Sequence, residues 1–383
     1  MTATYRPIID FIKTQFPEKD FIPLHAPLFI GNEKKYLLDA IDSTFVSSVG
    51  AYVNKFEYLM CEITGAKHCI AIVNGTNALH MALLLAGVNS EDEVLSQSLT
   101  FIATCNAISY IGANPMFIDV DQDTLGMSPK ALKQFLQSNA EIRGDGFTYN
   151  KQTNKRIKAC VPMHTFGLPC RIDELVVICN QWNITLVEDA AESLGSYYKG
   201  KHTGVFGLMG IFSFNGNKTV TCGGGGAIIT DDDALAKRAR HLTTQAKVAH
   251  SWAFVHDEIG YNYRMPNLNA ALACAQLEQL DKFIANKREL AFSYHRYFET
   301  QGVRFVSEIV EAKSNYWLNA ILLKNVEERE AFLAFANSNG VMSRPVWELM
   351  HRLPMFKNAQ KADLSNSEYI ADRLVNIPSS VRL

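Results

Sequence analysis

The sequence has no excess of charge of either sign. Among its 383 residues, Lys and Arg number 37 and Asp and Glu number 39, giving a formal net charge of -2. This near balance argues against nucleic acid or an anionic membrane surface as the main partner, because both require a basic surface. The densest basic cluster, KRARH at 237–241, is expected to be the solvated face of a helix.

Long apolar runs are also absent. The longest stretch, ALHMALLLAGV at 78–88, contains His80 and is too short to span a bilayer. Near the N-terminus, Asp10 and Lys13 interrupt a short apolar segment, which excludes the apolar core of a signal peptide. We therefore expect a cytoplasmic protein that makes no membrane contact.

The eight cysteines form no C-x-x-C pair and no Cys/His spacing typical of a zinc site. Cys69, Cys160 and Cys274 lie within apolar segments, where a thiol behaves as a small hydrophobic group. This usage favours a reducing compartment, and we expect no metal site.

What the sequence does contain is an alternation of strand-like and helix-like segments between Cys69 and Thr230. Short apolar runs with little alternation indicate strands buried on both faces, and strands that alternate with helices are typical of a mainly parallel, helix-covered sheet. The expected strands are CIAIV, PMFIDV, KACVPM, TLVEDA, GIFSF and GAIIT. The polar stretch at 140–158 is expected to be a surface loop.

After Thr230 the pattern changes to an α+β one. Residues 267–301 have a helical period that places Leu277, Leu280 and Ile284 on one face. Short strand-like segments and a helix at 327–340 follow. We predict two domains. The N-terminal segment and a large sheet domain occupy residues 1–265, and a long helix with a smaller α+β domain occupies residues 266–383.

Ligands of open α/β sheets bind at the carboxyl ends of the strands, and NGTNALHMALL at 74–84 follows such an end. Gly75 permits a tight turn there, and Thr76 is expected to cap the helix that follows. The free N–H groups of the first turn then form an anion site. An ordinary helix cap also explains this segment when it is considered alone.

Two further strand ends carry charged side chains. Asp189 ends TLVED and is either a structural cap or the partner of a buried cation. Lys218 lies in FSFNGNKTVTCGGGG, which is not a phosphate-binding P-loop because Asn217 separates Gly216 from the lysine. A loop lysine is usually solvated. Here the glycines at 223–226 would let the backbone come close to a bound group.

Together these features suit one cofactor. Pyridoxal phosphate needs an amine for its aldehyde, an anion for its ring nitrogen and a site for its phosphate. Burial lowers the pKa of a lysine and makes its free amine available, and an aspartate keeps the ring nitrogen protonated. The freed lysine then shuttles protons. The three strand ends therefore predict an enzyme that uses pyridoxal phosphate.

The stretch VEDAAESLGSYYKGKHTGVFGLMGIFSFNGNKTVTCGGGGAIIT closely resembles the signature of the DegT/DnrJ/EryC1/StrS family of sugar aminotransferases. NGTNALHMALLLAG, SLTFIATCNAISYIGANPMFIDVD, PMHTFG and GYNYRMPNLNAALACAQLEQLD resemble other blocks of that family, in the same order. The resemblance extends from about residue 22 to 380. It implies a fold-type-I, aspartate aminotransferase-like architecture, with pyridoxal phosphate passing through its amino form during turnover.

The resemblance also implies a role for particular residues. Lys218 would be the Schiff-base lysine and Asp189 the partner of the pyridine nitrogen. Glu192, where relatives often carry glutamine, would lie near the ring hydroxyl, and Phe101 would stack on the ring unless it is an ordinary core phenylalanine. Gly75, Thr76 and Ser213 would hold the phosphate, together with Asn262 from the neighbouring subunit of a homodimer with shared active sites. Asn77 would also bind the cofactor.

The N-terminal segment from IIDFIKTQF to VSSVGAYVNKFE resembles the 4-aminotransferases of the bacillosamine and legionaminic acid pathways. This implies a UDP-linked 2-acetamido-2,6-dideoxy-4-hexulose as substrate and L-glutamate as amino donor. The expected sugar-nucleotide contacts, for which packing, a turn or a surface ion pair is the alternative, are Ser48, His164, Arg264, Trp317, Trp347 and His351.

Other functions remain open at this point. The chain could be another nucleotide-sugar 3- or 4-aminotransferase, for example of the GDP-perosamine type, or a sugar dehydratase of the same fold. The dehydratases carry histidine where this sequence has Lys218, which favours amino transfer. A regulator that binds the cofactor without turnover is a third possibility, and the lack of a basic arm argues against it.

Overall fold

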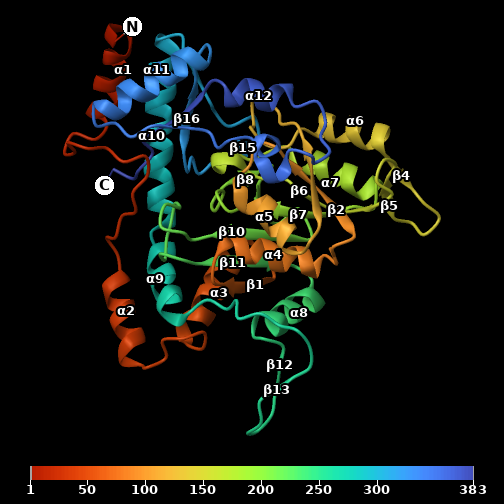
Figure 1. Cartoon of the computed structure of the whole chain (residues 1–383). Helices are drawn as coiled ribbons and strands as arrows, with labels where there is room; N and C mark the ends of the chain where they lie inside the picture. The colour runs from red at the N-terminus through yellow and green to blue at the C-terminus, as the bar shows by residue number, and fades with distance from the viewer. Residues whose placement is uncertain (1, 383) are drawn as a thin grey trace.

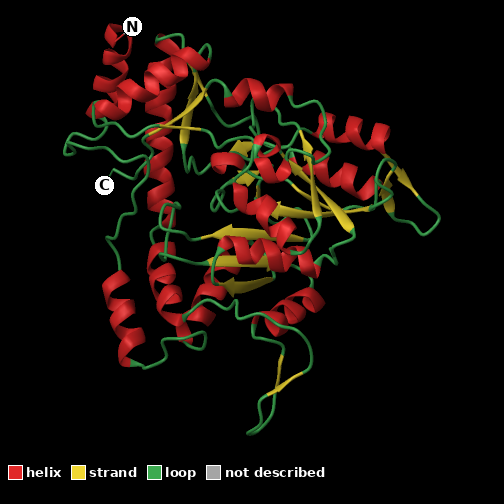
Figure 2. Ribbon diagram, viewed as in Figure 1, coloured by secondary structure: helices red, strands yellow, loops and turns green. Residues whose placement is uncertain are grey.

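The computed structural model describes residues 2–382 and contains one large sheet with helices on both faces (Figure 1, Figure 2). Five strands are parallel to one another, namely β10 (Met209–Ser213), β7 (Thr185–Asp189), β6 (Arg156–Val161), β2 (Asp92–Gln97) and β3 (Asn114–Ile118), whereas β11 (Gly226–Thr230) is antiparallel to both of its neighbours. The prediction of a mainly parallel α/β sheet is therefore confirmed, with one reversed strand. In spatial order the strands are β1 (His68–Ile72), β11, β10, β7, β6, β2 and β3.

Two layers of helices cover this sheet, because successive side chains of each strand point to opposite faces. Ile70 and Ile72 of β1 pack with one helical layer, and Cys69 and Ala71 with the other. The first layer contains α4 (Gly75–Leu85), α5 (Ile102–Tyr110) and α8 (Asp233–Thr243). The second contains α3 (Ala51–Thr64), α9 (Asn267–Leu277), α6 (Pro129–Asn139) and α7 (Ile172–Gln181).

Three parts of the sheet domain differ from expectation. Strand β2 and helix α5 are absent from the predicted series. Four of the six residues of DEVLSQ are polar, two at each end, although the whole strand is buried. The stretch at 140–158 is not simply a loop. It forms the hairpin β4 (Ala140–Ile142) and β5 (Thr148–Asn150) and then enters β6.

The C-terminal part forms a four-stranded antiparallel sheet in the order β14 (Arg304–Phe305), β16 (Asn319–Leu322), β18 (Leu374–Ile377) and β17 (Arg344–Pro345). The helical region before it is two helices, α9 and α10 (Leu280–Thr300), and it buries Leu277, Leu280 and Ile284 together as predicted. Helices α11 (Val326–Ser338) and α12 (Ser365–Ala371) and the 3-10 turns η2 (Met350–Arg352) and η3 (Pro354–Phe356) complete this part.

The N-terminal helix α1 (Thr2–Thr14) packs against C-terminal residues (Figure 1). Tyr5 contacts Phe332 of α11 edge-on, with 5.5 Å between the ring centroids, and Ile9 and Ile12 join the same hydrophobic cluster. The first helix thus lies beside the last sheet, although the sequence division assigns it to the large domain. The boundary at residue 265 stays a prediction.

Smaller elements surround the two sheets. They are α2 (Glu33–Asp42), η1 (Thr165–Gly167), the hairpin β12 (Lys247–Val248) and β13 (Val255–His256), and a three-stranded sheet of β15 (Ala312–Lys313), β8 (Tyr197–Tyr198) and β9 (Lys201–His202). All eight cysteines are unpaired. Among residues 2–382, no helix combines the length and the apolar character that crossing a membrane requires.

The basic cluster at 237–241 is more than a solvated face. It lies in α8, and Arg240 pairs with Glu57 at 2.5 Å, while His241 pairs with Asp257 at 2.7 Å. These bonds tie the helix to α3 and to the segment that follows β13.

Candidate active site

A cavity of about 290 Å³ opens at the carboxyl ends of β1, β7 and β10. Chain segments far apart in the sequence meet here because parallel strands present these ends on one edge of the sheet. Most of the expected cofactor residues line the cavity, namely Gly75, Thr76, Phe101, Asp189, Glu192, Ser213 and Lys218. Trp317 and Trp347, two of the expected substrate residues, line it as well.

Lys218 reaches into this cavity and is not a solvated loop lysine. Its side chain is 13% exposed, and its Nζ lies 3.2 Å from Glu192 Oε1. The same Nζ lies 3.9 Å from the centroid of the Trp317 ring. The Trp317 indole donates a 2.7 Å hydrogen bond to the carbonyl of Asn217, so it fixes the loop that carries the lysine.

Asp189 ends β7 with its carboxylate buried against the cavity. Oδ2 accepts a 2.7 Å hydrogen bond from Thr104 Oγ1, and Oδ1 accepts one of 3.2 Å from the backbone N–H of Ala191. Both partners are neutral, and burial raises the pKa of Asp189, with the Thr104 bond opposing that effect. A buried carboxylate of this kind is suited to a protonated nitrogen placed in the cavity.

Helix α4 begins at the cavity, but its cap is not Thr76 as expected. Asn74 is the cap, and its side chain accepts a 2.8 Å hydrogen bond from the backbone N–H of Asn77. The N–H groups of Gly75 and Thr76 in the same first turn have no intrahelical acceptor. They remain available to an anion, whereas that of Asn77 is already used.

The glycines near the cavity serve close packing of the chain. A Cβ on Gly75 would lie 2.9 Å from Ser213 Cβ, so this position requires glycine for a close approach, not for a special turn. A Cβ on Gly226 would lie 2.5 Å from the backbone of Asn74. The sequence analysis expected this glycine run to let the backbone approach a bound group. At Gly226 the group that comes close is the backbone of Asn74.

Residues 29–383 match the DegT/DnrJ/EryC1/StrS aminotransferase family. The chain belongs to this family. The match confirms the predicted fold-type-I architecture, and it confirms that the enzyme is a sugar aminotransferase dependent on pyridoxal phosphate.

Relatives of this aminotransferase align over almost its whole length. GDP-perosamine synthase of Escherichia coli O157:H7 is 39% identical over 94% of this chain and 93% of the relative. EpsN of Bacillus subtilis (strain 168) is 38% identical over 88% of this chain and 84% of the relative. The solved structure of a DegT DnrJ EryC1 StrS aminotransferase from Brucella abortus superposes with a TM-score of 0.81, at 26% identity, over 91% of this chain and 90% of the other.

The cavity of this aminotransferase fits pyridoxal phosphate. Lys218 provides an amine, Asp189 a buried carboxylate, and α4 an N-terminal turn with free N–H groups, all facing one space. Phe101 is 45% exposed and lies against Trp347 with 5.8 Å between ring centroids, so it is an accessible aromatic face and not a core residue.

Glu192 is the second buried acid of the cavity. Its Oε2 accepts a 2.9 Å hydrogen bond from the backbone N–H of Phe166, while Oε1 faces Lys218. Burial raises the pKa of Glu192 to about 7, and the charge of Lys218 opposes this effect.

Several of the expected substrate residues bond to other side chains of the protein and do not line the cavity. His164 does not line the cavity, since its Nε2 contacts Glu188 Oε2 at 3.0 Å and its Nδ1 accepts the backbone N–H of Cys170. It is a packed histidine, the alternative that the sequence left open.

His351 and Arg264 are also held by structural contacts. His351 Nδ1 lies 2.7 Å from Ser98 Oγ, and burial lowers the pKa of this histidine. Arg264 donates a 2.7 Å hydrogen bond to Glu57. Neither residue lines the cavity.

Ser48 and Asn262 lie on the surface, outside the cavity of their own chain. Ser48 is half-buried and lies in the loop between α2 and α3. Asn262 is exposed and forms a β-bridge with Thr244 near the base of the β12–β13 hairpin. The hairpin projects away from the body of the molecule (Figure 1).

Thr104 is a site residue that the sequence analysis missed. It lies in the first turn of α5, three residues after the N-cap residue Phe101, and its hydroxyl donates to Asp189. A prediction of β2 and α5 would have placed it beyond the carboxyl end of a strand, where the other site residues lie.

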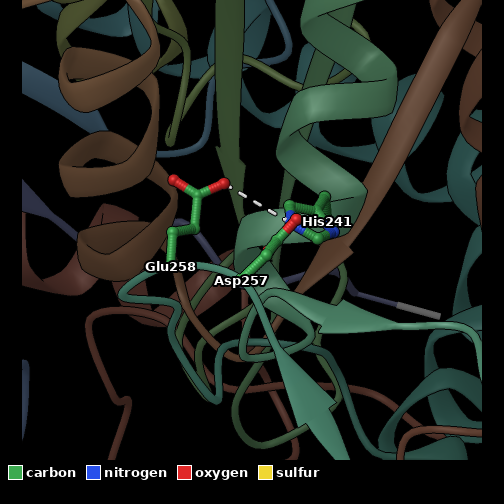
Figure 3. A group of neighbouring side chains, drawn as sticks. All are labelled: His241, Asp257 and Glu258. Atoms are coloured by element: carbon green, nitrogen blue, oxygen red, sulfur yellow. Dashed lines mark hydrogen bonds and ion pairs between the residues drawn. The ribbon is translucent and has the colours of Figure 1, made fainter.

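His241, Asp257 and Glu258 form a cluster with metal-ligating atoms, shown in Figure 3. Glu258 also accepts hydrogen bonds from both terminal nitrogens of Arg238, and His241 contacts Asp257 at 2.7 Å. Since the acids already pair with these basic side chains, the cluster is a surface ion-pair network between α8 and the segment after β13.

Proposed function

We propose that this aminotransferase converts a keto group of a nucleotide-linked sugar to an amine, with L-glutamate as amino donor. The observation that carries the proposal is the meeting of Lys218, Asp189 and the first turn of α4 in one cavity. A lysine amine, a strand-end carboxylate and a phosphate site are what this cofactor needs for amino transfer.

Each group of the chain has a distinct part in this proposal. Bound pyridoxal phosphate supplies an aldehyde and an electron sink. Asp189 holds a proton on the ring nitrogen, the N–H groups of Gly75 and Thr76 bind the phosphate, and Lys218 carries a proton to and from the reacting carbon. The aromatic side chain of Trp317, whose ring centroid lies 3.9 Å from Lys218 Nζ, covers one side of the reacting amine.

For the nucleotide, we propose a GDP-linked sugar as the first candidate. The support is the 39% identity to a GDP-perosamine synthase over nearly the whole chain. The UDP-linked 2-acetamido-2,6-dideoxy-4-hexulose implied by the N-terminal segment is the second candidate. A dehydratase function is disfavoured because Lys218 occupies the position of the dehydratase histidine.

We further propose a homodimer whose subunits share active sites. Large apolar side chains are exposed on the α2–α3 loop, on the β12–β13 hairpin and on the segment after it, among them Val49 at 70%, Trp252 at 84% and Ile259 at 84%. Exposed apolar patches of this kind mark interfaces. In the dimer, Asn262 would reach the phosphate in the neighbouring subunit, and Ser48 would border the sugar nucleotide there.

Subunit mixing tests the shared sites. Asn262→Ala and Lys218→Ala each inactivate the homodimer in this proposal, but a mixed dimer retains one site with both native residues. Activity that returns after the two inactive proteins are mixed supports sharing. Mixing without any return of activity contradicts it, provided that the two variants carry different affinity tags and that purification through both tags shows mixed dimers in the sample.

The substrate is tested by incubating the purified protein with glutamate and a panel of keto-sugar nucleotides that contains GDP-linked and UDP-linked members. Mass spectrometry identifies the nucleotide that gains an amine. We expect amination of the GDP-linked 4-keto sugar. Amination confined to the UDP-linked acetamido sugar would replace the first candidate by the second, and product that loses a hydroxyl without gaining nitrogen would indicate a dehydratase.

We also propose a cytoplasmic location, supported by the eight unpaired thiols, seven of which are buried. Formation of disulfides in the protein isolated from its native cells would contradict it.

A further inference from the structure

Glu192 and Lys218 form a buried acid–amine pair whose use in amino transfer is not explained by cofactor binding alone. Glu192 is 1% exposed, and its Oε1 lies 3.2 Å from Lys218 Nζ. A lysine can attack the cofactor aldehyde only as a free amine, so the ammonium proton has to leave before the bond to the cofactor forms. Glu192 Oε1 is the acidic acceptor that the chain places within hydrogen-bond distance of that proton.

The backbone around η1 fixes the orientation of the Glu192 carboxyl group. Phe166 has a φ of 58°, a left-handed conformation that is uncommon for a bulky residue, and its N–H donates to Glu192 Oε2. The second carboxyl oxygen is thereby directed at Lys218. The backbone of Glu192 is also held, because the Asn315 side-chain amide donates a 2.9 Å hydrogen bond to the Glu192 carbonyl.

The charges that face this pair come from three segments. Burial has the largest effect on Glu192 and raises its pKa to about 7, while the charge of Lys218 lowers the pKa and that of Asp189 in β7 raises it by less. Burial also lowers the pKa of His25 in the N-terminal segment, and the charges of Lys287 and Lys218 lower it further. Among the described residues, Lys218 and Asp189 are thus the charged groups that act on Glu192, and both members of the Glu192–Lys218 pair line the cavity.

We propose that Glu192 is the immediate proton acceptor for Lys218 and so positions it as a free amine. The N–H bond of Lys218 Nζ breaks, an O–H bond forms at Glu192 Oε1, and the nitrogen lone pair becomes available. An ammonium–carboxylate pair becomes an amine–carboxylic acid pair, so the net charge of the pair stays zero and no co-reactant is needed. The proposal rests on the proposed function, in which Lys218 is the reacting amine.

Glutamine cannot replace Glu192 in this role. Its amide oxygen accepts a hydrogen bond from the ammonium group but does not take the proton, because an amide is far too weak a base. Glu192→Gln preserves the shape of the side chain and removes proton exchange, but its NH₂ group also replaces one of the two oxygens that accept from Phe166 and Lys218. Glu192→Asp keeps the acid and both acceptor oxygens, so it separates the loss of proton exchange from the loss of an acceptor.

The test measures how fast the full-length apoprotein captures pyridoxal phosphate, by stopped-flow absorbance, from about pH 6 to pH 9. In the native protein the free-amine fraction of the neutral pair is constant once the pair has lost its extra proton, so the rate should level off above about pH 7. In Glu192→Gln the rate should keep rising, by up to about tenfold per pH unit, because a single deprotonation to solvent limits it. Superposable profiles for the two proteins would overturn the proposal.

A second measurement on the apoprotein does not depend on capture. Infrared difference spectra should show a protonated carboxyl band that titrates near neutral pH and is missing from Glu192→Gln. Glu192→Asp, which keeps the acid, should restore the levelling of the rate at least in part. A missing band in the native protein contradicts the proposal.

The failure of this proposal and that of the proposed function can be told apart. Lys218→Ala should capture no cofactor covalently. If native protein captures the cofactor through Lys218 but its pH profile equals that of Glu192→Gln, only the role of Glu192 is refuted. If native protein does not use Lys218 at all, the assignment of the reacting amine fails.

Discussion

Glu188 and Asp189 are adjacent acidic residues of β7, and both are buried, but their carboxylates have different surroundings. Their side chains point to opposite faces of the sheet, as the pleat of a strand requires. Glu188 accepts hydrogen bonds from three backbone N–H groups of the loop at 204–207, and it contacts His164 Nε2 at 3.0 Å. Every bonding direction of its carboxylate is used by the chain itself.

Asp189 has two neutral partners, Thr104 and Ala191, and otherwise faces the cavity. Burial raises the pKa of Asp189. Among the described residues, no cation lies close enough to form an ion pair that would cancel this rise. The difference teaches that burial of an acid does not by itself indicate a catalytic group. Of these two neighbouring acids, the one assigned to the cofactor is the one whose carboxylate the chain leaves without a close cation.

The largest expected effect is that of Lys218→Ala, which removes the reacting amine. Turnover should fall by about 10⁴-fold or more, because both covalent and proton-transfer chemistry are lost. The measurement is amino-sugar formation together with the cofactor absorption band. Lys201→Ala, an exposed lysine of β9, is the matched control and should leave both unchanged. Robust turnover in Lys218→Ala would refute the site.

Asp189→Asn tests the cavity side of the comparison. The amide keeps the shape and the Thr104 contact but cannot hold a proton on the ring nitrogen, so kcat/KM should fall by about 10²- to 10³-fold. The free energy of unfolding should change little, because a neutral side chain is easier to bury than a charged one. Loss of folding with full activity in the folded fraction would reverse the roles given to the two acids.

Glu188→Gln tests the acid that bonds only within the chain. Its new NH₂ group would face N–H donors that now bond to a carboxylate, so the free energy of unfolding should fall by about 2 to 4 kcal/mol. Chemical denaturation measures this change, with exposed Glu174→Gln in α7 as control. The folded fraction should keep near-native kcat/KM. A catalytic defect in a protein of native stability would mean that Glu188 also serves the reaction.

The smallest effect concerns Glu192, which shares the cavity with Asp189. Its pKa in the folded protein is raised to about 7, above its usual value, so its protonated form stabilises the fold fully only in acid, and this contribution is lost as pH rises through about 7. The stability of the native apoprotein relative to Glu192→Gln should therefore fall by about 1 to 3 kcal/mol between about pH 5 and pH 8. A difference in unfolding free energy that does not vary with pH would contradict the raised pKa.

Much of the fold could be predicted because apolar strand segments carry their own signal. The ends of CIAIV, TLVED and GIFSF place Gly75, Asp189 and Ser213 at one edge of the sheet from local pattern alone. Strand β2 was not predicted because its first two residues are acidic. Their burial depends on partners that are distant in the sequence. Asp92 pairs with Arg156 at 2.8 Å, and Glu93 accepts a 2.7 Å hydrogen bond from Asn150.

Side-chain partners were harder to predict than strand ends. Asn74 and Thr76 are both good capping residues, and only the backbone geometry shows that Asn74 accepts the bond. His164 follows a strand end, like the site residues, but its ring lies against Glu188. A residue type and a spacing do not state which side of a sheet or which loop a side chain will meet.

The order of residues along the chain determined the elements and the chemistry that their ends carry, because local periodicity and strand-end position depend on near neighbours. The tertiary structure alone decided that Lys218 faces Glu192 and Trp317, that Asp189 faces the cavity while Glu188 does not, and that α1 lies against α11. These outcomes depend on contacts between residues far apart in the chain, whose geometry is set by the packing of the whole molecule and by no local pattern.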